Sequence, residues 1–88
     1  MRVDKDDLEI AGRLLAGDNW QRALARMLAP YAPPRLNATG RGVDDSLLRK
    51  WKRGERNIPE WVGPALAALL RKRAKDAEAF AKRIDLST

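Results

Sequence analysis

The residues best suited to chemistry in this chain are cations that recur along one side of a short predicted helix. The stretch 43–61 reads VDDSLLRKWKRGERNIPEW. At about 100° per residue, a polar and cationic row falls on one side of this helix and an apolar group on the other. The row is Ser46, Arg49, Lys50 and Arg53, and the apolar group is Leu47, Leu48 and Trp51. Such a helix can pack its apolar side on a core and present its charged groups to a negatively charged partner.

Both ends of this helix carry residues that typically begin and end helices. Asp44 or Asp45 can cap the start by accepting a backbone N–H, and Gly54 can adopt the left-handed conformation that ends a helix. The helix then spans about two to three turns, which is too short for stability alone in water. The rest of the chain must therefore cover its apolar side.

The distribution of charge singles out the same part of the chain. Residues 1–18 carry a net charge of −2, residues 19–58 carry +6 and residues 59–88 carry +2, so the middle segment equals the +6 of the whole chain. A concentrated basic region on a small domain favours a polyphosphate partner, because binding releases the counterions of the phosphates. The alternative is a solvated face that only keeps the protein soluble.

The composition limits the other functions that the chain can have. Its 88 residues fit one domain, and they include no cysteine and no histidine, which excludes disulfides, the usual zinc ligands and histidine acid–base chemistry. We expect no enzyme activity, metal or small-molecule cofactor, because the sequence shows no carboxylate pair or nucleophile with a base. No apolar run is long enough for a signal peptide or a membrane span. These features predict a cytoplasmic, nucleoid-associated protein that does not bind membranes.

Three further helices are predicted to support the cationic one. Residues 6–15 place acids in the first turn and apolar residues on one broad side, which consists of Leu8, Ile10, Ala11, Leu14 and Leu15. Residues 20–29 form a second helix that ends before Pro30, with an apolar stripe of Trp20, Ala23, Leu24, Met27 and Leu28. A third runs from about Trp61 to Ile84 as one long helix or two stacked ones. The predicted fold is all-α, a compact bundle of four to five helices with a long C-terminal helix.

The segment between the second helix and the cationic one is predicted to be a loop. It reads PYAPPRLNATGRG over residues 30–42, with three prolines, two glycines and no sustained period. Connections of this length in small domains are often either functional or mobile. Arg35 and Arg41 favour a functional role, and both possibilities stay open.

The long C-terminal helix carries an apolar line whose second half has no predicted cover. Its members are spaced by four or three residues, and they are Val62, Leu66, Leu69, Arg73, Ala77, Phe80 and Ile84. The first half is expected to pack on the core, and residues 75–88 to form a dimerisation segment or a tail. The residues predicted to make a homodimer contact are Leu69, Ala77, Phe80 and Ile84. The alternative is a frayed, solvated end.

The second helix, the loop and the cationic helix together form a helix-turn-helix candidate. In that motif the second helix enters the DNA major groove and the first crosses the phosphate backbone. The residues expected at base edges are Asp45, Ser46, Arg49 and Lys50, with Arg49 placed to bind guanine. The residues expected at phosphates are Gln21, Arg22, Arg41, Lys52, Arg53 and Arg56.

Three short stretches resemble the lambda-repressor and Cro-like helix-turn-helix regulators. They are WQ and ALA at positions 20–25, DSLLRKW at 45–51 and GERNIPEWV at 54–62. The resemblance covers about Leu8 to Leu70, and it is closest to small phage and proteobacterial repressors, a general type that includes anti-CRISPR-associated autorepressors. It implies a dimeric double-stranded DNA-binding repressor that acts on an inverted repeat, with Gln21 at a phosphate. The chain departs from this family between the two motif helices, where thirteen residues stand instead of about three to four.

Two other functions are compatible with the same residues. The first is a helical protein-interaction module, such as an adaptor or an antitoxin-like partner, that uses the apolar line over residues 62–84. The second is a structured-RNA binder, because attraction to phosphates alone does not distinguish the nucleic acids.

Overall fold

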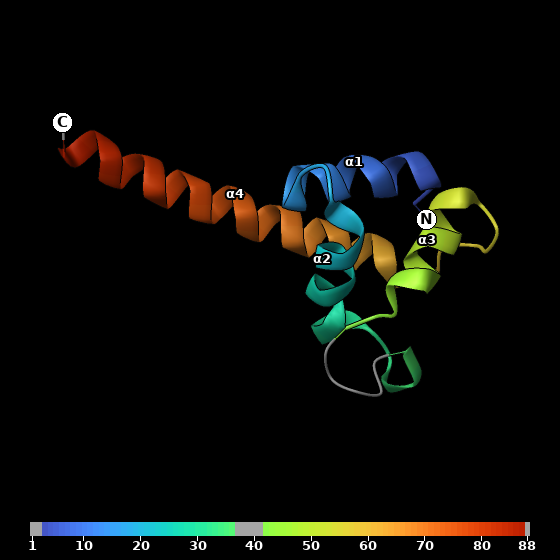
Figure 1. Ribbon diagram of the computed structural model, residues 1–88. Helices are drawn as coiled ribbons and strands as arrows, with labels where there is room; N and C mark the ends of the chain where they lie inside the picture. Colours follow the sequence, from blue (N-terminus) through green and yellow to red (C-terminus); the bar gives the residue numbers. More distant parts are fainter. Residues whose placement is uncertain (1–2, 37–41, 88) are drawn as a thin grey trace.

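The computed structural model describes residues 3–36 and 42–87, and every regular element in these ranges is helical. Its elements are α1 (Lys5–Ala16), α2 (Trp20–Met27), the 3₁₀ turns η1 (Ala29–Tyr31) and η2 (Pro34–Leu36), α3 (Asp45–Arg53) and α4 (Val62–Ser87). The first three α-helices pack around the beginning of α4, whose remainder projects away from them (Figure 1). The described part measures 49 × 27 × 25 Å along its principal axes. The prediction of an all-α fold with a long C-terminal helix is confirmed.

Helix α1 begins at an aspartate cap and buries a narrower face than the sequence predicted. Asp4 accepts the backbone N–H of Asp7 at 2.8 Å. Leu8 and Leu15 are buried in the core, but Ile10 and Leu14 are 58% and 59% exposed. Ile10 and Leu14 therefore lie on the apolar side that the sequence predicted, but they are not buried with Leu8 and Leu15. The bundle covers α1 along one stripe only, because the remaining side of the helix has no described element packed over it.

Helix α2 is anchored to α1 through a tryptophan that lies against a glycine. Trp20 is fully buried, and a Cβ atom added at Gly12 would overlap its ring. Leu24 and Leu28 are also fully buried. The sequence predicted Ala23 on the apolar stripe, but Ala23 is only partly buried and Ala25 is buried instead. The helix ends at Met27, two residues before the predicted end, and the chain continues into η1, which contains Pro30.

The long connection returns to the helix that it left. The backbone N–H of Val43 donates to the carbonyl of Ala25 at 2.9 Å. Gly42 has a φ of +125°, and a Cβ atom there would lie 2.5 Å from the same carbonyl oxygen. Helix α3 therefore starts beside the C-terminal half of α2, as it does in a motif with a short turn. The prediction of a plain loop needs correction, because η1 and η2 form two turns within it.

The core between α3 and α4 is built on two tryptophans. Trp51 is buried and meets Trp61 edge to face, with ring centroids 6.2 Å apart and an interplanar angle of 74°. The backbone N–H of Val62 donates to Pro59 at 3.2 Å, so the turn at Pro59 leads directly into α4. Ile58 is buried beside this turn. Burial of these large apolar side chains supplies the packing that α3 lacks on its own.

Helix α4 is one continuous helix with two unlike halves. Val62, Ala65 and Leu66 are buried, whereas every described residue from Arg71 onward is exposed. Arg73, the cation that interrupts the predicted apolar line, donates from Nη1 to the carbonyl of Leu15 at 2.9 Å. It thereby satisfies a carbonyl in the last turn of α1 and ties the two helices together. Among the described helices, none combines the length and apolar content needed to cross a lipid bilayer.

We expect Gly42→Ala to destabilise the protein by about 2–4 kcal/mol, because the new methyl group must both adopt a strained φ and overlap the backbone of α2. Urea unfolding followed by tryptophan fluorescence measures this loss. Gly54→Ala is the matched control, since Gly54 also has a positive φ of 77°, but a Cβ atom there would lie 4.0 Å from Cδ of Lys5, an ordinary van der Waals distance. This control is expected to lose only about 1 kcal/mol. Equal losses in the two variants would contradict the close approach at Gly42.

Candidate nucleic-acid interface

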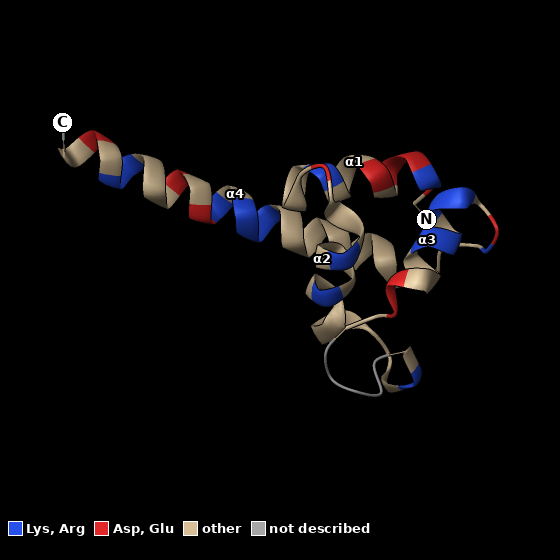
Figure 2. Cartoon of the chain, in the orientation of Figure 1, with Lys and Arg blue, Asp and Glu red and all other residues tan. Residues whose placement is uncertain are grey.

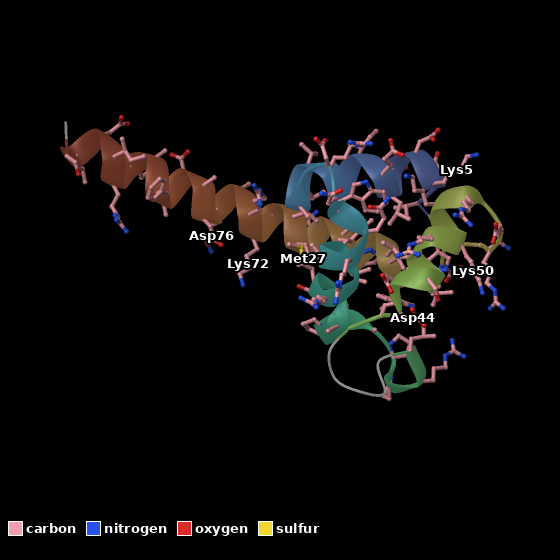
Figure 3. The ribbon with its side chains drawn as sticks, viewed as in Figure 1. Lys5, Met27, Asp44, Lys50, Lys72 and Asp76 are labelled. Atoms are coloured by element: carbon pink, nitrogen blue, oxygen red, sulfur yellow. The ribbon has the colours of Figure 1, made fainter. Side chains whose placement is uncertain are left out.

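Helix α3 separates its two faces as the sequence predicted. Leu48 and Trp51 are buried and Leu47 is partly buried. The row on the opposite side is exposed at every position, namely Ser46, Arg49, Lys50 and Arg53. Lys50 points away from the bundle, toward the solvent beyond α3 (Figure 3). The helix therefore presents a polar and cationic surface that no described element covers.

The two ends of α3 are held by the capping residues. Of the two candidate caps, Asp44 is the one used, and it accepts the backbone N–H of Ser46 at 2.9 Å. This backbone hydrogen bond, together with one from the Ser46 hydroxyl, lowers the pKa of Asp44 below its usual value. At the other end Gly54 adopts the left-handed conformation, and the N–H of Glu55 donates to Lys50 at 2.9 Å. The caps fix the length of the row, because they stop the helix at both ends.

Two residues predicted to contact bases are paired with each other. Arg49 donates from Nη2 to Oδ2 of Asp45 at 3.1 Å, one helical turn away. Both side chains are substantially exposed, at 56% for Arg49 and 38% for Asp45. Exposed pairs of this spacing are worth only about 0.3–0.5 kcal/mol, so a stronger partner can displace Asp45 easily. The pair also directs the guanidinium toward the N-terminal end of α3.

Lys52 lies outside the cationic row and contacts the first two helices. Its Nζ lies 3.9 Å from Oε1 of Glu9 and 5.7 Å from the centre of the Trp20 ring. This places the ammonium group between α3 and the first two helices, where it packs against the core. Lys52, a predicted phosphate contact, is thus set apart from Arg53 by its ion pair with α1. The guanidinium of Arg53 lies 3.8 Å from Glu55.

The connection after α2 places a further cation, Arg35, beside α3. The sequence analysis left open whether this arginine has a function. Arg35, in η2, lines a shallow depression together with Leu47 and Arg56. Arg56 was among the predicted phosphate contacts, and Arg35 was not. The signal that pointed to it was an arginine in an unusually long loop. The second loop arginine, Arg41, lies outside the described residues.

The other predicted phosphate contacts lie at the start of α2. Gln21 is half-buried and Arg22 is exposed, and both belong to the first turn of this helix. Asn19, which precedes the turn, makes no side-chain capping hydrogen bond. Figure 2 shows lysine and arginine on both α2 and α3, with acidic residues at the beginning of α1 and of α3. Both α2 and α3 therefore carry cationic residues.

The predicted dimer contacts occupy different environments along α4. Ala77, Phe80 and Ile84 are exposed on the projecting half. Leu69 is partly buried and lines a groove with Leu15 and Met27, whose outer end Ala77 also lines. It therefore belongs to the bundle rather than to the projecting half.

In residues 3–36 and 42–87, no three acidic side chains gather as they would to hold a metal ion.

Comparisons with protein-family models, with curated proteins and with solved structures found no match to this chain.

The capping hydrogen bond of Asp44 predicts a dependence of stability on pH. A carboxyl group whose pKa is lower in the folded state stabilises the fold above its unfolded pKa, and this contribution is lost as the pH falls through the folded value. Asp44→Asn keeps an oxygen that can cap the helix but does not titrate. We expect the wild type to lose more stability than this variant between pH 6 and about pH 2, as measured by thermal unfolding. Parallel losses in both proteins would contradict the role of the Asp44 charge.

Proposed function

We propose that this protein is a sequence-specific, double-stranded DNA-binding transcriptional repressor that reads the major groove with α3. The observation that carries the proposal is the exposed row of Ser46, Arg49, Lys50 and Arg53, which stands opposite a face buried against the other helices. A rigidly supported helix with one free cationic side has the form required to enter a groove lined by phosphates.

The dimensions of α3 suit a DNA groove. The helix has nine residues, so at about 1.5 Å per residue it is about 13 Å long. A helix with its side chains is about 10–12 Å wide, which matches the width of about 12 Å of the B-DNA major groove. The narrow, deep major groove of duplex RNA does not admit a helix in this way. This difference favours duplex DNA over structured RNA as the partner.

The side chains of the row can divide recognition among themselves. Arg49 has five N–H donors and spends one of them on Asp45, so it can offer a bidentate pair to O6 and N7 of guanine when that pair opens. Ser46 and Lys50 lie on the same side, at positions from which a hydroxyl and an ammonium reach neighbouring base edges. Asp45, once released by Arg49, can accept a hydrogen bond from cytosine N4.

Phosphate contacts are assigned to the cations around this row. Arg53 is the last residue of α3, Arg56 follows the helix, and Arg35 lines the same depression as Arg56. Gln21 and Arg22 supply contacts from the first turn of α2, as the resemblance to the lambda-repressor family implies. Two copies on an inverted repeat then occupy a promoter and exclude the transcription machinery from it.

Replacement of Arg49 by alanine is expected to lower affinity for the preferred DNA site about tenfold to a hundredfold, and to relax the base preference at one position of each half-site. Selection from random duplex DNA defines the site, and fluorescence anisotropy measures the affinity. Arg13→Ala is the control, because Arg13 is an exposed arginine of α1, outside the cationic row of α3, that pairs with Glu9 and Asp18. Unchanged affinity in Arg49→Ala would overturn the proposal.

Removal of a phosphate contact has a different signature from removal of a base contact. Arg53→Ala is expected to weaken binding to all duplex sequences to a similar extent. It should also reduce the slope of log K against log salt concentration by about one. Titrations with specific and unrelated DNA over a range of salt concentrations measure both effects. A loss confined to the preferred site, with an unchanged salt slope, would contradict the assignment of Arg53 to a phosphate.

A further inference from the structure

An unbroken stripe of small and apolar residues runs the whole length of α4. It follows the line that Arg73 interrupts at a displacement of one residue as far as Ala74 and shares Ala77 and Ile84 with it, and its positions alternate in spacing of four and three. The stripe consists of Gly63, Ala67, Leu70, Ala74, Ala77, Ala81 and Ile84, with Phe80 beside its last turns. A heptad spacing of this kind is typical of a helix that packs along another helix.

The first part of this stripe lines an open groove between α1 and α4. Gly63, Ala67 and Leu70 contribute one wall, and Ile10 and Leu14 contribute the other. These two α1 residues are 58% and 59% exposed. The groove is therefore an apolar surface on the bundle that no described residue of the chain covers.

The second part of the stripe lies on the half of α4 that projects from the bundle (Figure 1). Phe80 is 55% exposed and Ile84 is 48% exposed. This half cannot fold back into the groove of its own chain, because both belong to one continuous helix, Val62–Ser87. The molecule thus carries an apolar groove and an apolar ridge that cannot meet within a single copy.

We propose that the occupant of the groove is the projecting half of α4 from a second copy of this chain. In the resulting dimer the two α4 helices run antiparallel, and each ridge lies in the groove of its partner. One two-fold axis near Ala74 generates both contacts at once. A parallel arrangement would bring ridge against ridge and leave both grooves open.

The charges beside the stripe favour the antiparallel arrangement. Arg71 and Glu78 occupy the same flank of the stripe, one heptad apart. In an antiparallel pair of helices, residues of this flank face each other, so Arg71 of each copy lies near Glu78 of the other. Opposite charges therefore meet in the middle of the interface.

This inference rests on the proposed function only in that an inverted repeat calls for two copies related by a two-fold axis. The contact itself involves α1 and α4, not α3. Its tests are made without DNA, so that failure of the dimer and failure of DNA recognition are separate results.

The first test uses charge substitutions at exposed positions of the groove and the ridge. Leu14→Asp and Phe80→Asp are each expected to turn a dimer into a monomer in light scattering after size exclusion. A mixture of the two variants should regain a weaker dimer, because one groove and one ridge remain intact. Leu86→Asp is the control, since Leu86 is 89% exposed but lies off the stripe, and it should stay dimeric. Circular dichroism checks that each variant is folded.

The second test exploits the absence of cysteine from the sequence. Ile10→Cys and Ile84→Cys chains, mixed and oxidised, should form a disulfide-linked pair that contains one chain of each kind. A monomeric wild type at 100 μM would overturn the proposal. A Leu14→Asp variant that stays dimeric would also overturn it, because the groove would then not be the contact. A preference of Ile84→Cys for linkage to itself would do the same, because it shows that the ridges pack on each other.

Discussion

The return of the chain to α2 at Gly42 and Val43 is the constraint on which the rest of this structure depends. Helix α3 has nine residues and cannot hold its shape in water without packing, so its position must be imposed from outside. The hydrogen bond from Val43 to Ala25 and the close approach of Gly42 to the backbone of α2 impose it at the N-terminal end. A connection that is long in sequence therefore acts like a short one. Helix α3 therefore starts beside α2, although the connection between the two helices is long.

Much of this arrangement was predictable because its causes are local. The caps at Asp44 and Gly54 and the two faces of α3 follow from residue types at helical spacing, and the structure confirms each of them. The exposure of Ile10 and Leu14 was not predictable, because a hydrophobic pattern shows which side of a helix is apolar and not how much of that side other elements cover. The return of Gly42 to α2 also has no signal in the sequence, since it joins residues that a loop separates.

The acidic residues at the start of α3 bear on recognition as well as on folding. Asp44 is used by the helix itself, whereas Asp45 holds Arg49 in a weak, exposed ion pair. In the proposed complex this pair restrains a long side chain before binding, and so reduces the rotamer freedom that a base contact would otherwise remove. A neutral residue in place of Asp45 leaves the arginine equally cationic but less ordered. Selectivity then depends on the exchange of one partner of Arg49 for another, and phosphate attraction alone contributes little to it.

Helix α4 connects the two proposed surfaces mechanically. Trp61, directly before α4, meets Trp51 of α3, and Arg73 joins α4 to the end of α1. A continuous helix transmits orientation over its whole length, because its backbone hydrogen bonds resist bending. If each projecting half lies in the groove of the other copy as proposed, the same rigid element that supports α3 in one copy also sets the angle and distance to α3 in the other. The spacing of the two DNA half-sites would then be determined by residues of α4 that touch no DNA.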